Sequence, residues 1–251
     1  MKTKIITVMS TIALCTSCRC GDTAGYPTDT MKTGDGKCLS LTFFAHSSLL
    51  IDYDGLRIYT DPVSAHADYA RLPKADVILI SHEHYDHCDP AAVELLSKPE
   101  TLLIANAGSL AALGREGTAL SNGQSAAPLP GLRIEAVPAY NITPGHTDFH
   151  PQGGRDNGYV LSLGDTRIYL AGDSENTPEM MGLRDIDIAF LPVNQPYTMT
   201  VEQAAEAVHA IRPAIFYPYH YGQVEQRTDL ARLADLLADL PETEMRIRPL
   251  E

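Results

Sequence analysis

The sequence has few cysteines, and they do not form the pattern of a disulfide framework. Of the five cysteines among 251 residues, Cys15, Cys18 and Cys20 stand close together near the N-terminus, which leaves only Cys38 and Cys88 further along. Small secreted domains held together by disulfides have a much higher density of cysteine. We therefore expect Cys38 and Cys88 to be buried thiols, although an oxidising compartment would permit a bridge between Cys20 and Cys38.

Positive charge is also scarce. The chain has 19 Lys and Arg against 32 Asp and Glu, a formal net charge of −13. This excess of negative charge repels polyanions such as nucleic acids. A chain of this length also has no room for a large nucleic-acid domain beside one catalytic domain. We expect a small-molecule substrate and no nucleic-acid partner. A locally positive metal cleft would still accept small anionic substrates.

The N-terminal apolar run is too short to span a bilayer. Lys2 and Lys4 precede or flank the apolar residues 5–14, and this pattern is typical of a bacterial secretory signal. We expect residues 1–17 to be a signal peptide. Residues 18–38 are polar and rich in Gly and Thr, which predicts a flexible tether, followed by the catalytic domain at residues 39–251.

Cys18 is the expected site of signal cleavage. The small residues Thr16 and Ser17 precede it, as in lipoprotein signals, although Cys15 stands where that pattern has an aliphatic residue and ordinary cleavage nearby is the alternative. The prediction is an exported lipoprotein of the periplasm or cell envelope. It would touch the membrane only through a lipid anchor at Cys18.

One short segment contains an unusual density of metal ligands. His82, His84 and His87 together with Asp86 place three imidazoles and a carboxylate within six positions, and these are ligands for zinc and similar ions. An apolar strand-like run at residues 76–80 precedes them. They would therefore lie at the carboxyl end of a strand, where α/β sheets place their sites. A solvated polar loop is the weaker alternative.

This motif resembles the signature of the metallo-β-lactamase superfamily, and two motifs before it and four after it stand in the order of that superfamily. The resemblance covers residues 39–251 and is strongest for the branch that contains ascorbate-phosphate lactonases. The motifs that carry it stand at residues 44–51, 58–62, 136–141, 149–151, 169–173 and 218–220. A superfamily of this kind defines a fold and a metal site but serves many substrates.

The secondary-structure pattern suits the fold of that superfamily, an α/β four-layer αββα sandwich. Hairpin turns are expected at residues 53–56 and 163–166, and helices at 201–211 and 229–240, the first with a Thr200–Gln203 capping pair. A helix is also expected to begin after Asp89. Strands are predicted at residues 39–43, 48–52, 57–60, 77–80, 102–105, 132–137, 159–163, 167–171, 188–191 and 215–217.

The resemblance implies two metal ions held by seven residues. One ion would be held by His82, His84 and His150, the second by Asp86, His87 and His220, and Asp173 would bridge both. The spacing agrees, because residues two apart in an extended turn, such as His82 and His84, point the same way. A strand-end turn residue and a packed core histidine are the alternatives for Asp173 and His220.

Three further residues receive expected roles or compete for one. His46 follows the first strand, where it would orient substrate or serve as a structural histidine. Asp61 is expected to brace the site by hydrogen bonding to loop backbone or to a ligand imidazole. His146 stands in a second possible ligand motif, residues 143–147, but His150, between Phe149 and Pro151, fits the branch better and is preferred.

The function implied is metal-dependent hydrolysis. Two divalent ions, zinc first with manganese or iron as alternatives, would activate a bridging hydroxide and polarise the scissile bond of a lactone, ester, amide or phosphodiester. Asp86, Asp173 and His46 are the candidate catalytic residues. A protein that kept the fold but only binds metal or a partner is the alternative function.

Overall fold

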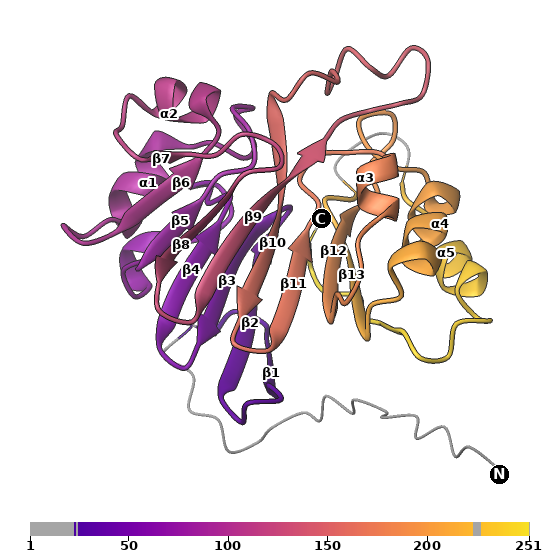
Figure 1. The fold of residues 1–251 in the computed structure, drawn as a ribbon, viewed down its shortest axis with the longest axis horizontal. Coiled ribbons are helices and arrows are strands. Elements are labelled where there is room, and N and C mark those ends of the chain that lie inside the picture. The colour runs from indigo at the N-terminus through magenta and orange to yellow at the C-terminus, as the bar shows by residue number, and fades with distance from the viewer. Residues whose placement is uncertain (1–22, 24, 223–226, 251) are drawn as a thin grey trace, which may run out of the picture.

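Two mixed β-sheets packed against each other form the centre of the structure, a computed structural model that describes residues 23, 25–222 and 227–250 (Figure 1). Each sheet has seven strands within these residues, hydrogen-bonded in sequence order. The first sheet contains β1 (Thr28–Lys32), β2 (Cys38–Ala45), β3 (Ser48–Tyr53), β4 (Leu56–Thr60), β5 (Val77–Leu79), β6 (Leu102–Ala105) and β7 (Thr118–Ala119). The second contains β8 (Ser125–Leu129), β9 (Leu132–Ala139), β10 (Asp156–Leu163), β11 (Thr166–Leu170), β12 (Ile188–Pro192), β13 (Ile215–Tyr219) and β14 (Glu244–Met245).

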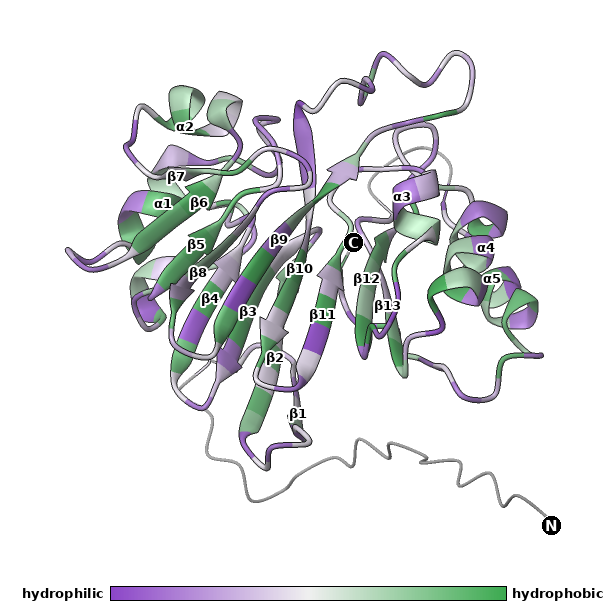
Figure 2. Ribbon diagram, viewed as in Figure 1, coloured by the Kyte–Doolittle hydropathy of each residue, from purple (hydrophilic) through white to green (hydrophobic). Residues whose placement is uncertain are grey.

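The core lies between the two sheets because the strands of both are rich in apolar side chains. Figure 2 shows hydrophobic residues concentrated along β5, β6, β12 and β13. Phe43 of β2 meets Tyr217 of β13 across the interface, with ring centroids 5.2 Å apart, and both side chains are fully buried. Burial of this kind supplies most of the free energy that holds the sheets together.

Helices cover the outer faces of the sheets (Figure 1). The short helix η1 (Tyr69–Arg71), α1 (Pro90–Leu96) and α2 (Ala107–Leu113) belong to the first sheet, and α3 (Pro178–Met181), α4 (Val201–Ile211) and α5 (Leu230–Leu236) to the second. The expected four-layer αββα sandwich is therefore confirmed. Among the described residues, no helix has both the length and the apolar character needed to cross a membrane.

Most of the predicted elements are present. All ten predicted strands are found, the helix at residues 201–211 is α4, and its Thr200–Gln203 capping box is formed. The prediction of a helix at 229–240 is wrong at its end, because α5 stops at Leu236. The chain leaves the helix there and buries Leu237 and Leu240 in the core.

The prediction of a tether at residues 18–38 is wrong for its second part. Residues 28–32 form β1, which pairs antiparallel with β2. Met31 is buried in the core, and the Asp29 carboxylate accepts hydrogen bonds from Tyr217 and Arg248, so the strand is fixed by long-range contacts that a polar local composition does not reveal. The predicted signal peptide and Cys18 lie outside the described residues.

The two cysteines among the described residues differ. Cys88 is a buried free thiol, as expected. Cys38, at the start of β2, is disulfide-bonded, so the prediction of a free thiol at this position is wrong.

Candidate metal centre

The predicted ligands come from loops that follow strands of both sheets. His82, His84, Asp86 and His87 follow β5, while the rest come from the C-terminal sheet: His150 from the β9–β10 loop, Asp173 after β11 and His220 directly after β13. A cleft of about 630 Å³ opens over them. His82 and His87 are completely buried, whereas the other five line the cleft.

Unusual backbone conformations aim several of these side chains. Gly172, directly before Asp173, has φ +64°, and a Cβ there would lie 2.7 Å from the carbonyl oxygen of Asn157, so only glycine fits. His46 and His220 have φ of +56° and +51°. The amide of His220 donates to the carbonyl of His46 at 3.2 Å, which ties these two turns together. Positive φ in residues with a side chain is costly and gathers at functional sites.

One group of ligand atoms is made by His82, His84 and His150. Their candidate ligand atoms all lie within 4.8 Å of one another, and Nε2 of His82 is 3.1 Å from Nδ1 of His84. Three imidazoles at this spacing can surround one ion.

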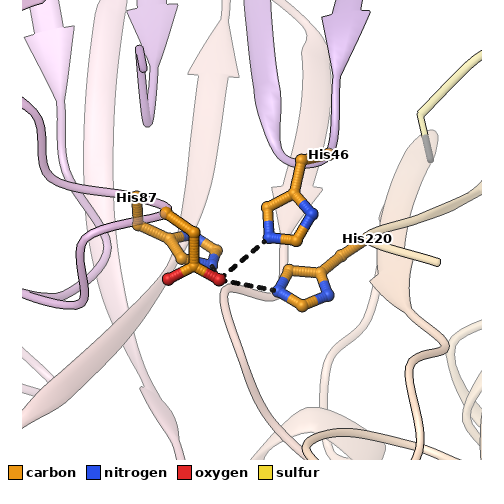
Figure 3. Close-up of side chains that lie close together, drawn as sticks. His46, His87 and His220 are labelled. Carbon is orange, nitrogen blue, oxygen red and sulfur yellow. Dashed lines mark hydrogen bonds and ion pairs between the residues drawn. The ribbon is translucent and has the colours of Figure 1, made fainter. Parts of the chain in front are cut away.

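A second group is made by Asp86, His87 and His220, together with His46. His46, His87 and His220 reach it from three separate segments of the chain (Figure 3). The Asp86 carboxylate lies 3.2 Å from Nε2 of His46 and 4.0 Å from Nε2 of both His87 and His220. His46 is thus in direct contact with a predicted ligand.

Asp173 lies between the two groups. Its Oδ1 is 3.3 Å from Nε2 of His87, and its Oδ2 is 3.1 Å from Nε2 of His220 and 3.4 Å from Nε2 of His150. The side chain is almost fully buried. One carboxylate therefore reaches imidazoles of both groups, as a bridging ligand must.

The outward-facing nitrogens of the imidazoles have partners of their own. In four of the histidines, Nδ1 contacts a neighbouring polar side chain, and this contact fixes the imidazole ring so that its Nε2 faces the candidate metal centre. The contacts are Ser81 Oγ to His82 at 2.9 Å, Asp61 Oδ2 to His87 at 2.9 Å, Asp156 Oδ2 to His150 at 2.9 Å, and the Asn194 amide to His220 at 3.2 Å.

Asp61 makes the contacts that the sequence predicts for it. Besides His87, its carboxylate accepts from the backbone N–H of Ser81 at 2.8 Å and from the Ser81 hydroxyl at 2.7 Å. The brace is confirmed. Ser81, Asp156 and Asn194 were not predicted; for Asn194, its position just beyond the predicted strand at residues 188–191 is the signal that could have found it.

The structure brings His150 into the cluster and leaves His146 outside it. Nε2 of His150 faces Asp173, whereas Nδ1 of His146 lies 3.5 Å from the Glu175 carboxylate and its side chain is partly exposed. The β9–β10 loop thus directs one of its two histidines to the centre.

Electrostatics at the centre favour bound positive charge. Burial opposes ionisation of Asp173, yet His220 and His87 hold the pKa of its carboxyl well below the usual range. Against the effect of burial, Asp156 and Asp173 raise the pKa of His150 to about 9, and Asp173 and Asp61 raise that of His87 well above the ordinary value. Protons on these rings balance the carboxylates, a role that a divalent cation can take over.

Several buried atoms at the centre lack a hydrogen bond. Nε2 of His87, Nε2 of His220 and Oδ1 of Asp173 are inaccessible to solvent and make no hydrogen bond of good geometry. Such atoms are costly and rare. All three are atoms of kinds that bind metals, and they face the centre. The residues therefore fit a bound metal, and a His and Asp set of this kind suits zinc, manganese or iron.

Comparison with known proteins places the chain in a family. The model of the β-lactamase superfamily domain matches residues 40–220. A UPF0173 metal-dependent hydrolase from Opitutus terrae is 31% identical over 73% of this chain and 85% of its own, and one from Methanopyrus kandleri is 29% identical over 73% and 84%.

Solved structures agree. A protein from Parabacteroides distasonis proposed to be a metal-dependent hydrolase is 50% identical, covers 90% of this chain and all of its own, and superimposes with a TM-score of 0.85. Igni18, a metallo hydrolase from Ignicoccus hospitalis, is 26% identical over 85% of this chain and 96% of its own, with a TM-score of 0.72. The chain therefore belongs to the metallo-β-lactamase superfamily, among relatives named metal-dependent hydrolases.

Proposed function

We propose that this protein is a hydrolase that uses two divalent ions, zinc first among them. The observation that carries the proposal is the pair of ligand groups with Asp173 between them. His82, His84 and His150 would hold one ion, and Asp86, His87 and His220 the other. When bound, two such ions supply a bridging hydroxide at neutral pH and polarise the carbonyl or phosphoryl oxygen of the substrate.

The protein's own side chains have three tasks in this proposal. Asp173 supplies the negative charge shared by both ions. Asp86 and His46, 3.2 Å apart, stand at the cleft side of the second group, where they can orient a substrate or exchange a proton with it. The partners at the Nδ1 atoms, such as Asp61 and Asp156, keep the imidazoles in one orientation.

The substrate is a small molecule with a lactone, ester, amide or phosphodiester bond. The resemblance to the branch with ascorbate-phosphate lactonases supports a lactone, and the names of the relatives support hydrolysis in general. The acidic chain supports the proposal that nucleic acid is not a partner.

The test combines metal analysis with turnover. The purified protein should contain about two divalent ions per chain after reconstitution, and should hydrolyse at least one member of a panel of lactones, carboxylic esters, amides and phosphodiesters. Metal removal by a chelator should abolish this activity, and added zinc should restore it. A protein without stoichiometric metal refutes the proposal. A protein that binds metal but hydrolyses no member of the panel supports the alternative, a binding protein on the same fold.

We also propose that the protein is exported and anchored at Cys18. Support comes from Lys2, Lys4 and the apolar residues 5–14 that precede the cysteine. The native protein should fractionate with membranes, and Cys18→Ser should release it or leave it unprocessed. Recovery in the cytoplasm with Met1 intact would contradict this location.

A further inference from the structure

Aromatic side chains gather at the mouth of the cleft. Tyr85, Phe149 and Tyr197 all line it. In the described part of the chain five large hydrophobic side chains are exposed, and two of them are Tyr85, at 87%, and Tyr197, at 39%. Single exposed hydrophobic residues are ordinary, but several beside one cavity mark a ligand-binding groove. We call these three residues the aromatic rim.

Part of the aromatic rim is held in place before any ligand arrives. The rings of Phe149 and Tyr197 meet edge to face, with centroids 4.9 Å apart and planes at 70°. The backbone carbonyl of Tyr197 accepts a hydrogen bond from the side-chain amide of Asn141 at 2.7 Å. The backbone N–H of Tyr197 donates to the carbonyl of Asn194 at 2.9 Å. A surface organised in this way loses little entropy when a flat group packs on it.

Away from the metal centre, the cleft offers no cationic side chain to a ligand. Among the described residues that line it there is no Lys or Arg, while Glu83 adds a carboxylate that the proposed metal site does not use. The nearby Arg155 is already engaged. Its guanidinium makes two hydrogen bonds of 2.6 Å to Asp156, donates to the carbonyl of Phe149 at 3.0 Å and lies 3.7 Å from Glu83.

We propose that the aromatic rim binds a flat, uncharged, apolar part of the substrate, and so sets the specificity of the site. The substrate would present its scissile group to the metals and no second phosphate or carboxylate to the rim. A remote anion there would lie away from the two ions, beside the Glu83 carboxylate and in the field of a chain with net charge −13, with no free Lys or Arg among the described lining residues to bind it. This inference rests on the proposed function, and it disfavours phosphorylated sugar-like substrates.

The test uses two ligands that share a metal-binding carboxylate and differ in the other end. 3-Phenylpropionate ends in a neutral ring, and succinate ends in a second carboxylate. Binding of each to the zinc-loaded protein is measured by calorimetry. We expect 3-phenylpropionate to bind at least about tenfold more tightly, since its ring can pack on the aromatic rim and lose contact with water there.

Variants of the aromatic rim test whether these residues cause the preference for 3-phenylpropionate over succinate. Tyr85→Ala and Tyr197→Ala should each weaken binding of 3-phenylpropionate about two- to tenfold, the worth of an aromatic contact, and leave succinate unchanged. Tyr85→Phe should retain the preference. Ile247→Ala, which removes an exposed apolar side chain outside the cleft, is the matched control and should change neither constant.

The possible failures are distinct. Equal or tighter binding of succinate, with zinc bound at stoichiometric level, overturns the role of the aromatic rim and leaves the proposed function standing. A preference for 3-phenylpropionate that survives both alanine variants overturns it too. A protein that takes up no zinc refutes the proposed function, and this inference with it.

Discussion

The two halves of the domain share one strand order and contribute different parts of the centre. In the N-terminal half (β1–β7) and the C-terminal half (β8–β14) alike, four strands pair antiparallel and the next three pair parallel. Each half places a carboxylate just beyond the strand where the pairing changes, Asp61 after β4 and Asp173 after β11. Asp173 faces the centre, whereas Asp61 braces His87 from outside. Similar frameworks thus acquire separate tasks through their loops.

The largest difference between the halves should appear at these two carboxylates. Asp173→Asn removes the charge shared by both ligand groups, so metal content should fall close to zero and turnover by about 1,000-fold or more, since each lost 1.4 kcal/mol costs tenfold and the metal site supplies several. Elemental analysis and kinetics measure the two effects. If the Asp173→Asn variant kept full metal and near-normal turnover, Asp173 would not be a bridge.

The second comparison concerns the connections between the second and third strands of each half, which carry His46 and His150. His150→Ala should remove about one ion per chain, because three ligands become two. His46→Ala should keep both ions and lower turnover. The control is His146→Ala, in the same loop as His150 but outside the cluster, which should have little effect. Loss of metal in the His146→Ala variant alone would show that His150 is the wrong choice of ligand.

Asp61→Asn should have an intermediate effect. The variant keeps the side-chain shape but weakens the contacts to His87 and Ser81, and the loss of such a partner typically costs about 10- to 100-fold in metal affinity or activity. Zinc titration against a competing chelator measures it. An effect as large as that of Asp173→Asn would mean that the two halves are functionally equivalent at these positions.

The smallest difference involves two aspartates at matched places, Asp76 before β5 and Asp187 before β12. Each accepts a backbone N–H, from Arg57 and Arg167 respectively, at 2.9 and 2.8 Å. Burial opposes the charge of both, but Lys98 and the Arg57 amide hold the pKa of Asp76 below the ordinary value, whereas burial raises the pKa of Asp187.

The lowered pKa of Asp76 contributes stability above about pH 4 that is lost as the pH falls through the folded-state pKa. The raised pKa of Asp187 has the opposite sign: its contribution is present at acid pH and lost as the pH rises. Asp76→Asn should therefore lower the free energy of unfolding at pH 7 by about 0.5 kcal/mol, the size expected for a partly exposed pair, and Asp187→Asn should not lower it. Urea unfolding at pH 7 and about pH 3.5 measures both; an equal loss at both positions would contradict the difference.

Much of the fold and of the ligand set follows from local sequence. The buried strands are continuous apolar runs, and the cluster from His82 to His87 is local, so both are visible without a structure. The strands that were missed, such as β1 and β14, are short and lie at sheet edges, where partners distant in sequence decide the pairing. Asp156 and Asn194 were missed for the same reason: each is an ordinary polar residue at or just beyond the end of a strand, and only the fold places it beside an imidazole.

The division of ligands between the halves has a consequence for biosynthesis. On the growing chain the four ligands of the β5 loop are made first, but they cannot complete either ligand group. His220 directly follows β13 and reaches the centre only after β13 has paired with β12. In the proposed metal site, an ion held by both halves would be retained tightly only by a folded domain, so metal content would report whether folding is complete.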